Sequence, residues 1–326
     1  MNLKDRCVNI LVTGVGAIIG YGIIKSIRRS GISARIIGMD IYPDAVGQHW
    51  CDEFIQAKYA VDPDYLNFLK DIIQTREIDL VFFGTEQELY RVNENRAEMA
   101  NDINKIVINR GELLELSADK WLTRKFLLEH GLAEFAIPSV IEGSYGEIAA
   151  LYGSEFLLKP RSSYASKGIN RVSDEESFNF YRKRMGADFM AQKLIGDAEH
   201  EYTVGVFGLG DGTCMGTIAL KRKLSQEGAT AKAQVVNIPA LNSAVERLCK
   251  VLCPIGPANL QFRMEGTHCY LLEINPRISS STSIRAALGY NEAQMCIEYF
   301  LRGNMIKPVV KAGRAARFID EVVVFD

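Results

Sequence analysis

Two oxygen-bearing side chains, Glu273 and Asn275, stand close together in the strand-like segment 268–275, "HCYLLEIN". Because side chains alternate between the two faces of a strand, both project from one face. A turn at residues 265–267 brings Gln261 of the preceding segment near residues 271–273. Carboxylate and amide oxygens suit Mg²⁺, with Mn²⁺ as the alternative ion. The segment therefore predicts a metal site, or else an ordinary solvated edge strand. The same alternation assigns Leu271 to the metal face, and to the other face Tyr270, Leu272 and Ile274.

Phosphate-binding chemistry is indicated by two basic side chains. Arg277 follows the metal segment, and a guanidinium can hold a phosphate through two parallel hydrogen bonds. Lys159 ends the strand-like run "EFLLKP", where it can act as a point charge for phosphate. The loop 161–168, "RSSYASKG", is rich in small residues whose backbone N–H groups can surround an anion. It lacks the spacing of a P-loop, so a simple hairpin turn is the alternative.

Four further charged side chains have both a binding and a structural interpretation. Glu86 and Glu88, in "FFGTEQEL", follow a strand-like run, where ligands of parallel sheets gather. We expect one of them to meet a substrate amino group, although acidic residues also favour helix N-termini. Arg285, in "SSSTSIRAALG", is a candidate for a substrate carboxylate or a helix surface charge. Glu201 is a candidate for ribose hydroxyls or a strand-edge charge.

The segment "LVTGVGAIIGYG" near the start has the strand–glycine–helix pattern of a dinucleotide-binding fingerprint, and Asp40 ends the next strand-like run. Its glycine spacing, G-x-G-x-x-x-G, differs from the strict G-x-G-x-x-G pattern. Glycines here also permit a tight strand-to-helix turn whatever the ligand. An NAD(P)-dependent oxidoreductase is therefore one alternative for the whole chain.

Elements that can position these side chains alternate between strand and helix over residues 8–113. The pattern predicts helices at 22–30 and 65–76, the second with Asp62 as its N-cap and Pro63 at its first position. Such alternation is typical of a parallel, doubly wound sheet. The predicted strands cover residues 8–13, 35–40, 53–58, 80–84 and 105–109.

The second half of the chain has a different pattern. A helix capped at Ser117 and ended by Gly131 is expected first. Two hairpins follow, with turns at residues 210–212 and 265–267, so this half is predicted to be antiparallel α+β.

Composition limits the classes of protein that fit. The chain has 326 residues, which suggests two or three domains. A net charge of −2 gives no general attraction to nucleic acid, and no apolar run reaches the roughly 18 residues that span a membrane. Seven cysteines without a C-x-x-C pair fit free thiols in a reducing cytoplasm, and the four scattered histidines do not suggest zinc.

These motifs, in this order and spacing, resemble the ATP-grasp family. The segment "NLQF…LLEINPRISSSTSIRAALG" looks most like one ATP-grasp module of the carbamoyl-phosphate synthase large subunit and its single-module relatives. The resemblance implies a fold of class α/β plus α+β, in which a Rossmann-like pre-ATP-grasp domain precedes a two-subdomain ATP-grasp fold. The expected parts are the Rossmann-like domain (1–113), a lid subdomain with a linker helix (114–190) and a C-terminal subdomain with the metal site (191–326).

The resemblance also implies roles for individual residues. Lys159 and Arg277 would be catalytic, and Gln261, Glu273 and Asn275 would bind Mg²⁺. The nucleotide would be held by Lys120, Lys159, Ser166, Gly168, Gln192, Lys193, Leu194, Glu201 and Arg222. Glu86, Glu88 and Arg285 remain candidates for the other substrates.

The expected activity is that of an ATP- and Mg²⁺-dependent ligase. ATP would phosphorylate a small-molecule carboxylate, and an amine would attack the acyl phosphate. The alternatives are a carbamoyl-phosphate-synthase-like reaction in an oligomer, for which a homodimer would supply two modules, an NAD(P)-dependent oxidoreductase, and a non-catalytic ATP-binding regulator. No nucleic-acid or membrane partner is expected, and the expected location is the cytoplasm.

Overall fold

The front of the chain forms a parallel sheet with helices on both faces. The computed structural model describes residues 6–162, 168–226 and 228–324, and its first sheet has the strand order β3–β2–β1–β4. Its strands are β1 (Val8–Thr13), β2 (Ala34–Asp40), β3 (Glu53–Gln56) and β4 (Leu80–Phe82). Helix α1 (Ile18–Ser30) packs on one face, and α2 (Tyr65–Thr75) and α3 (Glu86–Glu94) pack on the other. The parallel sheet expected from the sequence is confirmed.

Two local predictions in this region are wrong. Residues 105–109 form no strand, because the chain leaves the sheet after the 3₁₀ turn η2 (Ile103–Lys105) and keeps only one bridge, from Ile106 to Val81. Asp62 is not the N-cap of α2, which begins after Asp64. The Asp62 carboxylate instead accepts a hydrogen bond from the Asp64 N–H at 2.9 Å, within the preceding turn.

The turn between β1 and α1 depends on its glycines. Gly14 has φ +55°, in the left-handed region that favours glycine. A Cβ atom on Gly20 would lie 2.2 Å from the carbonyl oxygen of Gly14, so the helix can start this close only without a side chain there. The N–H of Gly16 donates to Asp40 Oδ2 at 2.7 Å. Close packing of Gly20 on Gly14 and the hydrogen bond to the Asp40 carboxylate thus account for the glycine pattern without a bound dinucleotide.

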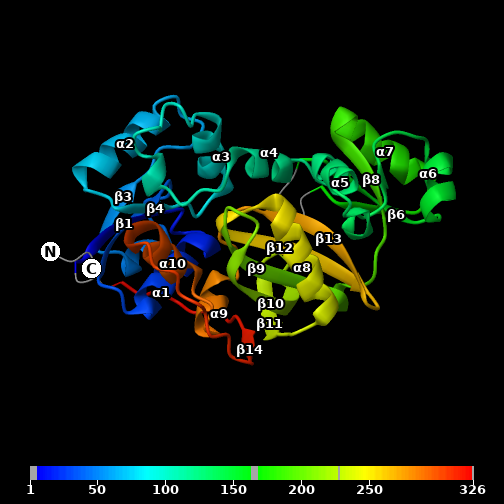
Figure 1. Ribbon diagram of the computed structural model, residues 1–326. Helices are drawn as coiled ribbons and strands as arrows, with labels where there is room; N and C mark the ends of the chain where they lie inside the picture. The colour runs from blue at the N-terminus through cyan, green and yellow to red at the C-terminus, as the bar shows by residue number, and fades with distance from the viewer. Residues whose placement is uncertain (1–5, 163–167, 227, 325–326) are drawn as a thin grey trace.

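A second, smaller sheet is antiparallel and has the order β5–β8–β6–β7. It contains β5 (Ser139–Val140), β6 (Phe156–Pro160), β7 (Asn170–Val172) and β8 (Phe189–Lys193). Helices α6 (Tyr145–Tyr152) and α7 (Glu175–Met185) pack on it through Ile148 and Phe178. Strand β8 runs past residue 190, the limit proposed for the lid subdomain. Figure 1 shows this unit in green at one end of the molecule.

Two helices, rather than one, lead into the second sheet. α4 (Gly111–Ala118) and α5 (Lys120–Glu129) are separated at Asp119. The Asp119 carboxylate caps α5 by accepting from the N–H groups of Trp121 and Leu122. The cap predicted at Ser117 is therefore wrong, and its hydroxyl donates to the Leu114 carbonyl. The extra break places Lys120 in the first turn of α5.

The third sheet is antiparallel, with the order β13–β12–β9–β10–β11–β14. Helix α8 (Pro239–Leu252) packs on one of its faces, and short turns connect its two predicted hairpins. The opposite face presents polar residues to the cavity at one end and apolar residues to the front domain at the other. The strands are β9 (Glu201–Leu209), β10 (Cys214–Leu224), β11 (Thr230–Val235), β12 (Ile255–Glu265), β13 (His268–Asn275) and β14 (Arg314–Ala316).

The β12–β13 hairpin contains a bulge that the alternation rule missed. Gln261 pairs with Glu273, but the next residue, Phe262, pairs with Leu271. Leu272 is therefore an extra residue in β13, and the facing pattern shifts there. Leu271 lies in the buried core with Ile274, not on the face of Glu273 as expected.

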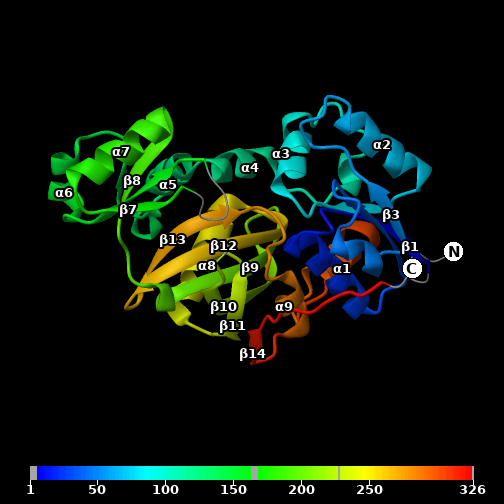
Figure 2. The same cartoon turned by 180° about the vertical axis from the view of Figure 1, so that it is seen from behind.

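The C-terminal sheet and the front domain share one hydrophobic core. Ile10 and Ile23 of the front domain belong to the same buried cluster as Phe207 and Leu220 of the C-terminal sheet. The short helices α9 (Thr282–Ala287) and α10 (Glu292–Cys296) pack against α1. Figure 2 shows α9 close to α1, below the front domain. Among the described residues, no helix is long and apolar enough to cross a membrane.

We expect Gly20→Ala to destabilise the protein by about 1–3 kcal/mol, because the new Cβ would overlap backbone atoms of Gly14. The thermal unfolding midpoint, measured by calorimetry, should fall by several degrees. Gly146→Ala is the matched control, since its added Cβ meets nothing within 4 Å in an exposed part of α6. Equal midpoints for the two variants would contradict this account of the turn.

Candidate nucleotide and metal site

A cavity of about 720 Å³ lies where the front domain, the small sheet and the C-terminal sheet meet. Its walls come from α5, β6, β8, β9, β10, β12 and β13, and from the segment before α3. This volume is in the range of small-molecule sites. The structure brings most of the predicted nucleotide and metal residues to this cavity: Lys120, Lys159, Gln192, Glu201, Arg222, Gln261, Glu273, Asn275 and Arg277.

Three oxygen donors lie together on the cavity face of the β12–β13 hairpin. The pairing sets Gln261 opposite Glu273, with Asn275 opposite Asn259 farther along the same strands. A set with one carboxylate and two amides fits Mg²⁺, which takes few protein ligands and completes its shell with water and substrate phosphates. Among the described residues there is no cluster of three or more His, Cys, Asp or Glu that could hold a metal ion. The three oxygen donors of the hairpin therefore fit a hard cation such as Mg²⁺, with the substrate supplying further ligands.

A buried ion network joins the metal face to β9 and β10. Both oxygens of Glu201 are engaged: Oε1 accepts from Arg222 Nη2 at 2.7 Å, and Oε2 accepts from Arg263 Nη2 at 2.7 Å. Arg222 Nη2 also donates to Gln261 Oε1 at 2.6 Å. Arg222 and Glu201 are almost fully buried. The network fixes one wall of the cavity and holds the Gln261 amide in place.

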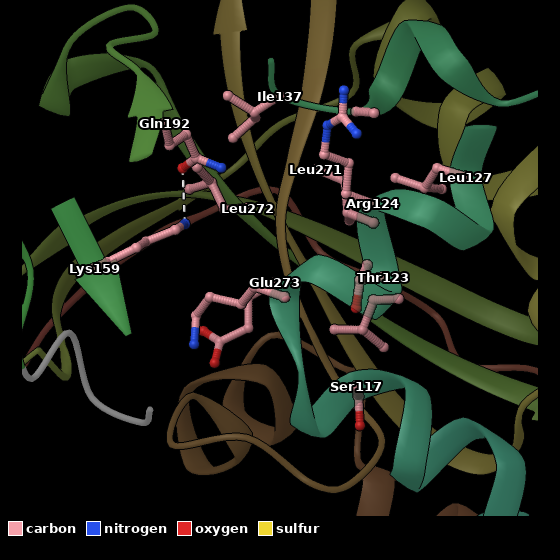
Figure 3. Close-up of a pocket in the computed structure, with 13 residues that line it drawn as sticks. Ser117, Thr123, Arg124, Leu127, Ile137, Lys159, Gln192, Leu271, Leu272 and Glu273 are labelled. Atoms are coloured by element: carbon pink, nitrogen blue, oxygen red, sulfur yellow. Dashed lines mark hydrogen bonds between the residues drawn. The ribbon is translucent and has the colours of Figure 1, made fainter. Parts of the chain in front are cut away.

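Lys159 is a buried ammonium group on β6. Its Nζ donates to Gln192 Oε1 at 2.7 Å, the bond dashed in Figure 3. Gln192 is held in turn, because its amide group donates to Ser139 Oγ at 3.0 Å. Burial, assisted by the neighbouring charge of Lys120, lowers the pKa of Lys159 from 10.5 to about 7. A polyanion in the cavity would favour the charged form.

Lys120 stands beside Lys159 in the first turn of α5. Burial lowers its pKa, whereas the nearby Glu273 carboxylate acts in the opposite direction. Its backbone N–H donates to the Arg161 carbonyl at 3.0 Å, which ties α5 to the end of β6. A narrow pocket next to the main cavity is lined by both lysines and by Ile137 and Leu271, giving a polar and an apolar side.

Arg277 is held by a contact between domains. Its Nε donates to Glu86 Oε1 at 3.0 Å, and its Nη2 contacts the same oxygen. Nη2 also donates to Asn275 Oδ1 at 3.0 Å. The front domain thus positions the guanidinium beside the metal face, and Glu86 reaches the cavity through this ion pair.

Two of the predicted substrate residues do not reach the cavity. Glu88 is buried in the front domain, where hydroxyls of Thr13, Tyr65 and Thr85 donate to its carboxylate. Burial raises its pKa. These hydrogen bonds explain why a glutamate follows β4 at this position, and no ligand is needed to explain it.

Arg285 is also buried, although a surface or substrate charge was expected. It is 0% exposed and pairs with Glu292, likewise 0% exposed, at 2.9 Å. It further donates to Thr203 Oγ1 at 3.1 Å. This ion pair joins α9 and α10 to the central strands of the sheet.

The remaining predicted residues lie near the cavity in different ways. The side chain of Lys193 is exposed, and its N–H donates to the Pro138 carbonyl at 3.0 Å. Leu194 follows it and is half-buried. Gly168 lines a neighbouring cavity and has φ +75°. Ser166 lies outside the described residues.

Sequence reasoning missed several residues at this site. Arg263 lies on the cavity face of β12 and neutralises Glu201, and Asn259, four residues before Arg263, also lines the cavity. Their alternation with Leu260 and Phe262 was the available signal. The ion pair of Asp119 with Arg161, which links α5 to β6, joins residues too far apart in the chain for any local pattern to reveal.

Comparison with known proteins bears on the fold of the chain. Residues 188–320 match the family described as "ATP-grasp in the biosynthetic pathway with Ter operon". The carbamoyl phosphate synthase large chain of Thermoplasma volcanium is 23% identical over 290 residues. That match covers 81% of this chain but only 28% of the relative.

Similar solved structures cover nearly the whole chain. N5-carboxyaminoimidazole synthetase of Staphylococcus aureus, complexed with ADP, has a TM-score of 0.70 and 18% identity, covering 97% of this chain and 82% of that one. Biotin carboxylase of Campylobacter jejuni has a TM-score of 0.74 and 16% identity, covering 95% and 74%. The chain therefore has the ATP-grasp fold. Residues 188–320 match an ATP-grasp family, and the chain is similar in sequence to the carbamoyl phosphate synthase large chain.

The lowered pKa of Lys159 predicts a pH-dependent stability. Between pH 7 and 10.5 the unfolded chain binds this proton and the folded protein does not, so the stability lost by burying Lys159 is regained as the pH rises. Lys159→Met should therefore raise the thermal unfolding midpoint at pH 7, and its advantage should shrink toward pH 10.5. Lys223→Met, at an exposed position of β10, is the control. Identical pH profiles for the two variants would refute the assignment.

Proposed function

We propose that the protein is an ATP- and Mg²⁺-dependent, ADP-forming carboxylate–amine ligase. The observation that carries this proposal is the cavity in which Lys120, Lys159 and Arg277 face the oxygen donors of the β12–β13 hairpin. Phosphoryl transfer needs positioning and charge neutralisation, which cations and a metal supply. The homologous carbamoyl phosphate synthase and the similar ADP-bound synthetase support it.

In this proposal, each group of residues has one task at the nucleotide. Lys120, Lys159 and Arg277 neutralise its phosphates, and we assign Ser166 and Gly168 to phosphate binding as well. Gln261, Glu273 and Asn275 would hold Mg²⁺, which would supply positive charge to the phosphates. The backbone of residues 192–194 lines the adenine. Oε2 of Glu201 accepts one hydrogen bond from Arg263 and keeps a second lone pair for a ribose hydroxyl, while Arg222 orients the carboxylate through two hydrogen bonds to Oε1.

The reaction then proceeds in two balanced steps. A carboxylate oxygen attacks the γ-phosphorus, the bond from that phosphorus to the bridging oxygen breaks, and ADP leaves. The amine next attacks the carbonyl carbon of the acyl phosphate, inorganic phosphate leaves with the electron pair of its C–O bond, and the nitrogen loses a proton to water. The Arg277 guanidinium, fixed by Glu86, stabilises the charge on the transferred group.

Two alternative functions receive less support from the geometry, and a third differs from the proposal only in the absence of turnover. An NAD(P) site at β1–α1 would need the Gly16 N–H, which already binds Asp40. A carbamoyl-phosphate-synthase-like reaction would need a second module, which a second copy of the chain would supply, because this chain spans 28% of that relative. A non-catalytic regulator would bind nucleotide without turnover.

Glu273→Ala is expected to weaken Mn²⁺ binding to the ADP-loaded protein at least about 10-fold, because it removes the carboxylate of the metal site. Electron paramagnetic resonance of Mn²⁺ measures the bound fraction without a known substrate. Glu246→Ala, an exposed position of α8, should bind Mn²⁺ like the wild type. An unchanged affinity in a folded Glu273→Ala protein would exclude this metal site.

Nucleotide binding should take up a proton above pH 7. At pH 8 most Lys159 is neutral in the free protein, and the phosphates of MgADP would restore its charge. Isothermal titration calorimetry at pH 8, in buffers of different ionisation enthalpy, should give different heats, whereas at pH 6 the difference should nearly vanish. Lys159→Met should abolish the buffer dependence. Buffer-independent heats for the wild type at pH 8 would contradict a Lys159–phosphate contact.

A further inference from the structure

A second cavity of about 870 Å³ adjoins the nucleotide cavity. One wall is the α3 helix of the front domain, with Gln87, Tyr90, Arg91 and Glu94. The opposite wall includes Glu273 and Asn275, which also line the nucleotide cavity, and Glu86 lines both. The two cavities therefore meet at the metal donors, so a molecule in the second one would reach the transferring phosphate.

Four charged side chains line the second cavity: Glu86, Arg91, Glu94 and Glu273. Glu86 pairs with Arg277, and Glu273 belongs to the metal donors. Burial raises the pKa of Tyr90, whose surroundings include the charges of Glu86, Arg277 and Glu273. This places the α3 surface within electrostatic reach of the metal face.

Arg91 is the cation of this set, and no other described residue forms a hydrogen bond or ion pair with its guanidinium. The residue is half-buried, and its Nε is shielded from solvent without an acceptor. A shielded, unsatisfied donor of a charged group costs free energy unless a ligand accepts its proton. The Nε and Nη edge of a guanidinium matches the two oxygens of a carboxylate.

The spacing of Arg91 from the reacting centre along α3 sets a minimum length for the substrate. Arg91 lies five residues after Glu86, which is roughly 7.5 Å along a helix axis. Glu86 marks the reacting end, since it holds Arg277 beside Asn275. A molecule held by Arg91 would thus span several bonds to reach the metal donors.

We propose that Arg91 binds a carboxylate of the second-cavity substrate that does not itself react. The substrate is therefore a small molecule that carries this carboxylate in addition to its reacting group: an amino acid that reacts through its amine, or a dicarboxylate that reacts through its other carboxylate. This inference rests on the proposed ligase function and adds the substrate class and its anchor.

The test uses ADP release from MgATP with the full-length protein. The probes are common L-amino acids and short linear dicarboxylates, singly and in pairs, each beside its analogue without the additional carboxylate. The variants are Arg91→Gln and Arg91→Lys, with Arg29→Gln on the exposed side of α1 as the matched control. Affinity for MgADP is measured on every variant by calorimetry.

We expect turnover with carboxylate-bearing probes and little with their analogues. Arg91→Gln should raise the KM for the active probe about 10- to 100-fold, the effect of one charged hydrogen-bonded pair. Its kcat and its MgADP affinity should stay near those of Arg29→Gln, and Arg91→Lys should recover part of the loss. A purely structural role would move the unfolding midpoint and leave the KM unchanged.

Three results would overturn the inference while leaving the ligase proposal intact. These are a KM in folded Arg91→Gln equal to that of Arg29→Gln, equal turnover of the analogues without the carboxylate, and no turnover of any probe by a protein that binds MgADP. Failure of the wild type to bind MgADP would instead refute the ligase proposal, and this inference with it.

Discussion

The register of the β12–β13 hairpin is the constraint on which the site depends. Pairing of Gln261 with Glu273 sets three oxygen donors on one face, and the extra residue Leu272 turns Leu271 into the core beneath them. A bulge that changes the direction of a side chain in this way lets one short strand line the cavity at one end and pack into the hydrophobic core at the other. Without the extra residue, either the donors or the apolar side chains would face the wrong layer, because a shift of one residue reverses every face.

The front domain contributes the far wall and the orientation of Arg277. A shared hydrophobic core with the C-terminal sheet fixes its position, so the Glu86–Arg277 pair bridges two packed units rather than two mobile ones. The buried Arg285–Glu292 pair lies under the same sheet and joins α9 and α10 to it. Each buried charge there has a partner, as the low dielectric demands.

The features that could be predicted from the sequence are those that depend on neighbouring residues in the chain. The glycine turn after β1, both hairpin turns and the run of polar residues along β13 depend on neighbours in the chain, and the fold class followed from them. The burial of Glu88 and Arg285 depends on partners such as Tyr65 and Thr203, far away in sequence, so an exposed and a buried charge could not be told apart. The strand expected at 105–109 failed for the same reason, since a single bridge to β4 does not propagate. The roles of the cavity residues stay predictions, although the fold gathers them.

The charges of the cavity explain why it suits an anion better than water. Lys159 is buried with an amide oxygen rather than a carboxylate as its hydrogen-bond acceptor, and Lys120 adds a second positive charge beside it. A carboxylate in contact with Lys159 would stabilise the empty protein, but it would also compete with phosphate. Gln192 instead orients the ammonium without neutralising it. The free protein therefore carries the free-energy cost of burying this charge, and under the proposed function a bound polyanion would relieve that cost.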